Sequence, residues 1–314
     1  MENARPPWIP EKIIRYENEL LLRWRFTGDK IFSEPFFEDT ITQFRNLREN
    51  QSAFQSLSGI GFLSDVREFP ETAAPSAVIF HVSRCGSTLF SQLLSLDEKN
   101  IVLAEVPVFN QLLYLENRDA SERQKLFRAA VNFYGQKRSG LEKRVFIKTD
   151  CWHIHDAAFY RAVFPAVPFV FLYRDPAAVI HSHRKRRGMH FVPGLVPQPV
   201  KHAGENLDLY SARVLAAYYN AGLDWFANDG NTLLVNYSEG LLNGLMRLLQ
   251  TIAAEPDAAL YKRMQERSAY HSKRPGETFM ADNKITLPSD QPYAEAQAFY
   301  EKLETARKPA IPVA

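Results

Sequence analysis

The sequence predicts an α/β protein with a central parallel sheet flanked by helices. Four short strands are expected, at Ala77–Val82, Arg144–Lys148, Pro168–Tyr173 and Asn231–Asn236. Stretches of helical length lie between them, and short apolar strands that alternate with helices are typical of a parallel sheet covered on both faces. The chain has 314 residues, which is enough for one large domain or two small ones.

The N-terminal region is expected to be mostly helical. Apolar residues recur at helical spacing within residues 11–70, first at Ile13, Ile14, Tyr16, Leu20, Leu21 and Trp24 and then at Phe36, Phe37, Ile41 and Phe44. The stretch Glu68–Ser76 contains two prolines and small residues, which predicts a linker. We therefore expect a helical N-terminal region over residues 1–75, packed on a core domain over residues 76–314.

The core domain is expected to carry five helices, at Ser87–Leu96, Asp119–Tyr134, Trp152–Phe164, Pro176–Arg187 and Leu207–Asn228. In an open α/β sheet, ligands bind outside the carboxyl ends of the strands. The residues that follow each strand are therefore the first place to look for chemistry.

Composition and charge narrow the classes of function. The formal net charge is only +2, which does not favour a nucleic-acid partner. No apolar stretch reaches 18 residues, so no membrane span is expected, and the N-terminus lacks the apolar segment of a secretory signal. The two cysteines, Cys85 and Cys151, do not form a disulfide framework, which favours a cytoplasmic location.

The first core strand leads into a loop suited to phosphate, Ser83–Thr88. Gly86 allows a tight turn in which backbone N–H groups converge on an anion, and the positive end of the following helix points to the same place. Arg84 adds a forked cation, and Ser87 and Thr88 add hydroxyl donors. The structural alternative is an ordinary capped helix after a strand.

This loop differs from the P-loop of nucleotide triphosphatases. It lacks the G-x-x-x-x-G-K-[ST] pattern, since no lysine precedes Ser87. Asp150 and Asp175 follow strands, but each sits behind a basic residue, so a strand-end ligand for magnesium is poorly supported. No metal is expected, and an ATP-dependent phosphotransferase remains an alternative.

A second anion site is expected after the third core strand, which runs into Arg174-Asp175-Pro176. Pro176 suits the first turn of a helix, and Ser182 lies eight residues after Arg174 on that helix. Arg174 and Ser182 are therefore candidates to hold one phosphate together. The alternative is that Asp175 caps the helix and Arg174 pairs with a surface carboxylate.

Together, the two sites resemble the PAPS-dependent sulfotransferase family over roughly Ser76 to Tyr237. The resemblance implies a P-loop-like fold and transfer of a sulfuryl group from PAPS to a hydroxyl or amine acceptor, leaving adenosine 3′,5′-bisphosphate (PAP). In that family the first loop holds the 5′-phosphosulfate and the Arg–Ser pair holds the 3′-phosphate. The implied donor-binding residues are Ser83, Arg84, Cys85, Gly86, Ser87, Thr88, Arg174 and Ser182.

The donor loop is most similar to that of the tyrosylprotein branch, which also has arginine rather than lysine there. By this resemblance Glu105, nineteen residues after Gly86, is the candidate general base. Lys148, at the end of the second strand, would stabilise the sulfuryl group with Arg84, and Tyr237 would line the donor pocket. Other members of the family use a histidine as base.

Three points depart from the family pattern or stay open. Cys85 stands where the family usually has serine, and either His153 or His155 is an alternative base. A late basic segment suggests that Lys273 or Arg274 closes the donor site. A nucleotide-binding module without catalysis is a further alternative, and the acceptor class and oligomeric state are left open.

Overall fold

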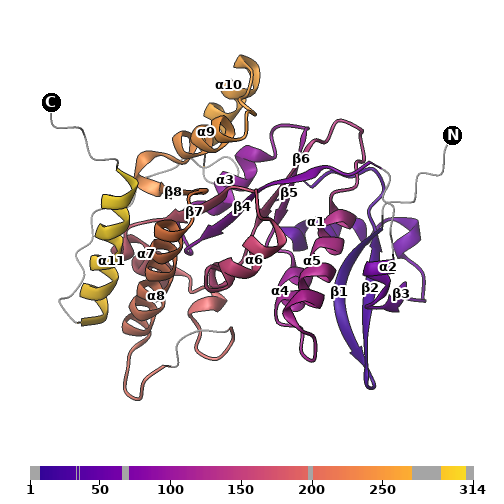
Figure 1. Cartoon of the computed structure of the whole chain (residues 1–314), viewed down its shortest axis with the longest axis horizontal. Coiled ribbons are helices and arrows are strands. Elements are labelled where there is room, and N and C mark those ends of the chain that lie inside the picture. Colours follow the sequence, from indigo (N-terminus) through magenta and orange to yellow (C-terminus); the bar gives the residue numbers. More distant parts are fainter. Residues whose placement is uncertain are drawn as a thin grey trace. The chain divides into compact units, whose positions relative to one another are not determined.

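The computed structural model describes residues 8–32, 34, 36–65, 71–196, 201–270 and 291–308 (Figure 1). The chain divides into two compact units, each built from three separate stretches. The first unit consists of Met1–Val78, Ser91–Lys148 and Ala158–Val167. The second consists of Ile79–Phe90, Thr149–Ala157 and Pro168–Ala314. No helix in the described ranges is both long enough and apolar enough to cross a membrane.

A five-stranded sheet has the order β5-β6-β4-β7-β8. Its strands are β4 (Ala74–His81), β5 (Asn100–Ala104), β6 (Arg144–Lys148), β7 (Phe169–Tyr173) and β8 (Thr232–Asn236). β5 pairs with β6 and β7 pairs with β8 in parallel ladders. This confirms the α/β prediction, and the four expected strands lie within a few residues of their predicted positions.

The sequence prediction missed β5, although all five of its residues are buried. The run Asn100–Ala104 is short and is followed almost at once by a helix, so periodicity alone does not separate it from helical core. The Asn100 side chain is held by the carbonyl of Leu94, to which it donates a 2.9 Å hydrogen bond. This strand matters because its carboxyl end leads directly into Glu105.

All five expected helices are confirmed, and one of them begins as a 3-10 turn. After β4, the described residues form the following α-helices (α) and 3-10 helices (η): α3 (Ser87–Leu94), α4 (Pro107–Leu113), α5 (Ala120–Tyr134), η2 (Cys151–Asp156), α6 (Ala157–Val163), α7 (Pro176–Lys185), η3 (Met189–Phe191), α8 (Leu207–Asn228), η4 (Tyr237–Glu239), α9 (Leu241–Thr251), α10 (Ala258–Ser268) and α11 (Gln291–Arg307). In the second unit, α11 packs along α8 (Figure 1).

The helical prediction for residues 11–70 is wrong for most of that range. The region forms an antiparallel sheet of β1 (Trp8–Tyr16), β2 (Glu19–Phe26) and β3 (Leu57–Gly59), and its helical elements are α1 (Phe37–Phe44), η1 (Arg48–Asn50) and α2 (Phe62–Asp65). Only the second apolar cluster, at α1, is helical as expected. The linker expected at Glu68–Ser76 is also partly wrong, because β4 already begins at Ala74, and residues 66–70 lie outside the described residues.

A tight turn explains why the first apolar cluster forms a hairpin. Glu17 has a left-handed backbone, with φ at 51°, and it reverses the chain between β1 and β2. Glu11 lies at an irregularity in the register of β1, and its buried carboxylate accepts hydrogen bonds from Arg23 and Arg25 on β2. Apolar spacing by itself did not reveal this turn, because the flanking runs carry several adjacent apolar residues.

Candidate functional site

The loop between β4 and α3 has the strained backbone that an anion cradle requires. Arg84 and Gly86 both have left-handed conformations, with φ at 57° and 84°. Ser83, Ser87 and Thr88 are buried, and the thiol of buried Cys85 donates a 2.6 Å hydrogen bond to the carbonyl of Val82. Two left-handed residues so close together turn the backbone sharply at the start of a helix, which favours a concave set of N–H groups.

Only glycine fits at position 86. A Cβ atom there would lie 3.0 Å from Cδ2 of Tyr237 and still closer to a methyl group of Leu241. The positive φ already disfavours any side chain, so two independent constraints select glycine. Gly86 therefore allows Tyr237 to lie directly against the loop.

Three arginines are joined in the second unit through their backbone carbonyls. Nη2 of Arg84 donates a 2.6 Å hydrogen bond to the carbonyl of Arg186, just beyond α7, and Nη1 of Arg174 donates a 3.0 Å bond to the carbonyl of Arg84. Arg174 follows β7, and Arg84 follows β4. The fold thus gathers cationic side chains from three separate chain segments.

The guanidinium group of Arg84 does not have all of its hydrogen bonds made. Among the described residues, no carboxylate forms an ion pair with Arg84, and its buried Nε has no hydrogen-bond partner. Burial lowers the pKa of this guanidinium, and the nearby charge of Arg186 lowers it further. Both effects disfavour the charged form, so an anion placed here would relieve both desolvation and repulsion.

Arg174 is held in place through both its side chain and its backbone carbonyl. Its guanidinium lies over the ring of Tyr237 at 4.2 Å from the centroid, and its carbonyl accepts a 2.7 Å hydrogen bond from the Tyr219 hydroxyl. Asp175 caps α7 through the N–H of Ala178, as the structural alternative expected. That cap does not use Arg174, whose side chain turns instead to Arg84 and Tyr237. The predicted grouping of the loop, Arg174 and Tyr237 is therefore found in one unit.

Ser182 lies on α7, half-buried, and its carbonyl accepts a hydrogen bond from the N–H of Arg186. Arg186 belongs to the basic run His183–Arg187, whose members have different roles. Arg184 and Arg187 form ion pairs with Asp208 and so fasten α7 to α8. Arg186 forms no such ion pair among the described residues, and it adds its charge to Arg84.

In the first unit, Glu105 and Lys148 form a close ion pair. The Lys148 side chain is completely buried, and its Nζ donates a 2.5 Å hydrogen bond to Oε1 of Glu105. The N–H of Glu105 also bonds to the carbonyl of Lys148, which extends the β5–β6 ladder by one residue. The ring of Phe36 lies 5.3 Å from the Lys148 ammonium group. The partly exposed carboxylate of Glu105 is thus held at a fixed place.

Backbone strain coincides with two predicted catalytic residues. Among the described residues, five that are not glycine have positive φ, and Arg84 and Glu105 are two of them. Such conformations cost of order 1–3 kcal/mol and persist where the surrounding structure enforces them. Glu105 has φ at 56°, directly after β5 and before α4.

The two alternative bases have different surroundings. His153 is buried, with Nε2 at 3.8 Å from a carboxylate oxygen of Asp150. His155 is exposed overall, but its ring packs on Tyr218, and this partial burial lowers its pKa.

Sequence reasoning did not single out Arg186, Phe36, Tyr219 or Leu241. Arg186 was hidden within a run of basic residues, of which Arg184 and Arg187 form structural ion pairs. The other three have no local signal because their partners are far along the chain. Lys273 and Arg274 lie outside the described residues. Within the described ranges, no group of three or more His, Cys, Asp or Glu residues is arranged to hold a metal ion.

No protein-family model matches the chain, and no curated protein matches it significantly. Several solved structures are similar to it. A sulfotransferase from Alicyclobacillus acidocaldarius is 16% identical, with 75% of this chain and 94% of that chain covered at a TM-score of 0.42. The sulfotransferase STF1 from Mycobacterium tuberculosis is 11% identical (78% and 79% covered, TM-score 0.45), and a mouse sulfotransferase complexed with PAP is 10% identical (81% and 90% covered, TM-score 0.37).

Proposed function

We propose that the protein is a sulfotransferase that takes its sulfuryl group from PAPS. One observation carries the proposal: cationic groups gather at a left-handed loop that begins a helix. The guanidinium of Arg84 is half-buried and its Nε has no hydrogen-bond partner, while Arg174 and the positively charged Arg186 lie close to it. This arrangement suits a ligand with several anionic groups. PAPS carries a 5′-phosphosulfate and a separate 3′-phosphate.

The assignment of each phosphate follows the family resemblance. The Ser83–Thr88 loop is proposed to hold the 5′-phosphosulfate, and Arg174 with Ser182 is proposed to hold the 3′-phosphate. Tyr237 would line the donor pocket, and Lys273 would close it. The resemblance of the loop to the tyrosylprotein branch remains a prediction and says nothing about the acceptor, since fold and donor site do not determine it.

In the proposed reaction, the acceptor oxygen or nitrogen forms a bond to sulfur while the bond from sulfur to the 5′-phosphate oxygen breaks. The electron pair of that bond goes to the phosphate of PAP. Arg84, Lys148 and the loop N–H groups would stabilise this charge, and no metal ion is needed for it. Glu105 would accept the proton that the acceptor loses. His153 and His155 remain the alternative bases.

The proposal is tested by calorimetric titration with PAP in the absence of metal, alongside ADP with Mg²⁺. We expect PAP to bind and the Arg84→Ala and Arg174→Ala variants to lose about tenfold to a hundredfold in affinity, since each removes charge-assisted hydrogen bonds. Arg184→Ala is the matched control, because Arg184 is an exposed arginine on α7 that pairs with Asp208.

Each other result has a definite meaning. A preference for ADP with Mg²⁺ would support a phosphotransferase, and failure to bind either nucleotide would reject the donor site. PAP binding without any turnover of PAPS, over a panel of hydroxyl and amine acceptors, would indicate a nucleotide-binding module without catalysis.

A further inference from the structure

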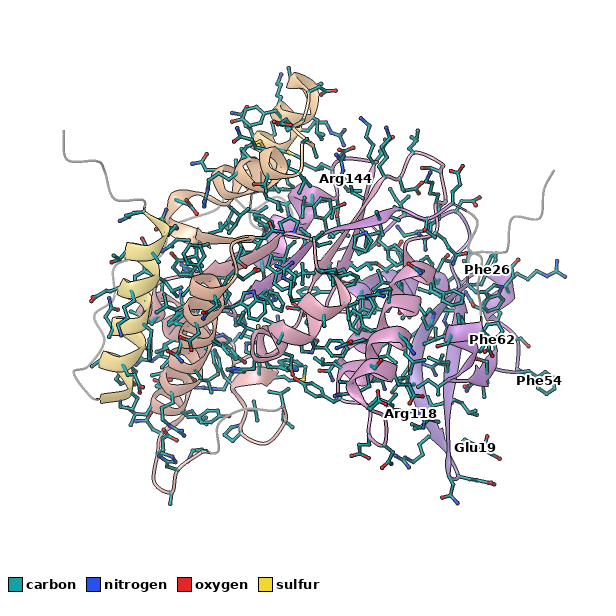
Figure 2. The ribbon with its side chains drawn as sticks, in the orientation of Figure 1. Glu19, Phe26, Phe54, Phe62, Arg118 and Arg144 are labelled. Atoms are coloured by element: carbon teal, nitrogen blue, oxygen red, sulfur yellow. The ribbon has the colours of Figure 1, made fainter. Side chains whose placement is uncertain are left out.

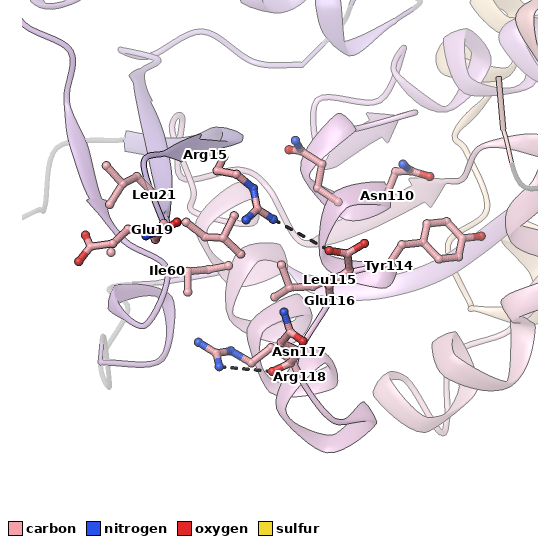
Figure 3. A pocket seen from close by; sticks show the side chains of 14 residues that line it. Arg15, Glu19, Leu21, Ile60, Asn110, Tyr114, Leu115, Glu116, Asn117 and Arg118 are labelled. Carbon is pink, nitrogen blue, oxygen red and sulfur yellow. Dashed lines mark hydrogen bonds and ion pairs between the residues drawn. The ribbon is translucent and has the colours of Figure 1, made fainter.

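The first unit contains a cleft of about 790 Å³ that the proposed donor site does not use (Figure 3). It lies between the β1–β2 turn, the end of β3 and the C-terminal end of α4. No predicted site residue lines it. A cleft of this size can hold a small organic ligand.

The wall between β1 and α4 is fixed by one side chain. Gln111 on α4 accepts a 2.8 Å hydrogen bond from the N–H of Ile13 and donates another of 2.8 Å to the carbonyl of the same residue. The amide thus pairs with the outer edge of β1 as a neighbouring strand would. Both hydrogen-bonding groups of Gln111 are used in this way, so its role is to hold the cleft in shape.

The cleft has a mixed polar and apolar lining with no excess of either charge. Its lining contains two arginines and two glutamates, and Arg15 points across the cleft to Glu116, 4.0 Å away (Figure 3). Arg118 pairs with Glu122 at 3.0 Å on the adjoining helix. Both arginines thus have carboxylate partners, and the lining adds a second carboxylate at Glu19, so it does not favour an anionic ligand.

Neutral hydrogen-bonding groups and a ring complete the lining. Asn18 in the β1–β2 turn and Asn110 and Asn117 around α4 contribute amides, each of which can both donate and accept. Tyr114 is 37% exposed, and the apolar floor includes Ile60. Planar amides, paired ions and a partly exposed ring suit a neutral ligand that carries many hydroxyl groups on an otherwise apolar frame.

The position of the cleft relates it to Glu105 within the same unit. Glu105 precedes α4 and the cleft lies at the far end of that helix, so at 1.5 Å per residue the two are separated by roughly 10–14 Å. In Figure 2, Arg144 at the amino end of β6 lies on the opposite side of the first unit from Glu19 and Arg118. The cleft therefore lies on the side where β5 and β6 end.

We propose that this cleft binds a neutral saccharide, as the part of the acceptor remote from the hydroxyl that reacts. The proposal rests on the proposed sulfotransferase function, because it assumes that the reacting hydroxyl of the acceptor gives its proton to Glu105. A short oligosaccharide spans the distance along α4. An acidic peptide fits less well, since Glu19 and Glu116 line the cleft and both arginines are paired.

The test measures binding directly, without turnover. Cellotriose is the probe, and hydrogen–deuterium exchange of the full chain is followed at millimolar cellotriose with and without PAP. We expect slower exchange in residues 13–21 and 107–118. Calorimetry should show that Asn18→Ala and Arg118→Ala each weaken cellotriose binding by about fivefold or more while PAP affinity stays unchanged. Arg263→Ala, on exposed α10 in the second unit, is the control.

The outcomes separate this proposal from the proposed function. Cellotriose protection confined to the cleft, lost in both variants, supports the saccharide site whether or not PAP binds. PAP binding with no cellotriose protection overturns the saccharide site and leaves the donor proposal standing. Protection by an acidic tyrosine-containing peptide in place of cellotriose also overturns it.

Discussion

Gly86 and Gly140 have nearly the same left-handed backbone, with φ at 84° and 83°, but only Gly86 is crowded by other atoms. An alanine at either position carries the cost of a left-handed conformation, about 1–2 kcal/mol. At Gly86 the new methyl group must also displace the Leu241 side chain, and it presses on the ring of Tyr237, over which Arg174 lies. The two glycines therefore separate backbone strain from the geometry of the donor site.

We predict that both Gly86→Ala and Gly140→Ala lower the thermal stability of the protein, Gly86→Ala by the larger amount because of its clash, whereas only Gly86→Ala weakens PAP binding. Thermal unfolding and calorimetry on the same samples measure both effects. An equal loss of PAP affinity in Gly140→Ala, whose position has open space around it, would show that Tyr237 is not involved.

Glu105 offers the second prediction at the residue scale. Glu105→Gln removes the proton acceptor but keeps an oxygen to receive the hydrogen bond of Lys148, so we expect turnover to fall by about 10²–10⁴-fold with PAP affinity nearly unchanged. Glu105→Ala is a poorer test, because it also removes the oxygen to which the buried Lys148 donates, and removing one partner of a buried ion pair costs about 3–5 kcal/mol in comparable cases.

The alternative bases are examined in the same assay. His153→Asn and His155→Asn should retain most of the turnover if Glu105 accepts the proton. A large loss in either histidine variant, together with an active Glu105→Gln enzyme, would move the role of base to that histidine. PAP titrations of all three variants show whether a loss comes from catalysis or from donor binding.

At the scale of elements, α11 holds the ends of two strands. Glu304 on this helix accepts 2.6 Å hydrogen bonds from the hydroxyl of Tyr173 and from the amide of Asn236. These are the last residues of β7 and β8, and they directly precede Arg174 and Tyr237. A helix near the end of the chain thus sets where both strands deliver their donor-site residues.

The ionisation of Glu304 makes this link sensitive to pH. Burial alone would raise its pKa, but hydrogen bonds from Arg307, Tyr173 and Asn236 outweigh burial and hold the pKa at about 2, below the ordinary value of 4.5. A folded-state pKa below the unfolded one stabilises the fold above about pH 4.5. That stabilisation is lost as the pH falls from 4.5 towards 2.

We predict that Glu304→Gln lowers the free energy of unfolding at pH 7 and reduces its decline between pH 4.5 and pH 2. If Glu304 positions Arg174 and Tyr237, the variant also weakens PAP binding while turnover at saturating donor is kept. Denaturant unfolding at several pH values and PAP calorimetry measure the two effects. Glu301→Gln, exposed on the same helix, should change neither, and unaltered PAP affinity in Glu304→Gln would limit α11 to a structural role.

At the scale of the whole molecule, the sequence predicted what is encoded locally. The donor loop is a strand, a glycine turn and a helix in succession, so Arg84 and Gly86 were recognisable from neighbouring residues alone. Arg174 was found by the same logic. The link from Tyr173 to Glu304 joins residues 131 positions apart, and no local pattern marks it. The hairpin of β1 and β2 was missed because one strained turn at Glu17, rather than spacing, decides it.

The division into two units has a consequence for synthesis of the protein. From its N-terminus onward, the chain crosses from one unit to the other five times, and the last residue of the first unit is Val167. Neither unit is therefore available as one continuous fragment, and a single protease cut cannot release either one whole. During synthesis, two stretches of the second unit leave the ribosome before the first unit is complete. We therefore expect partly synthesised chains to expose apolar core residues, which chaperones bind.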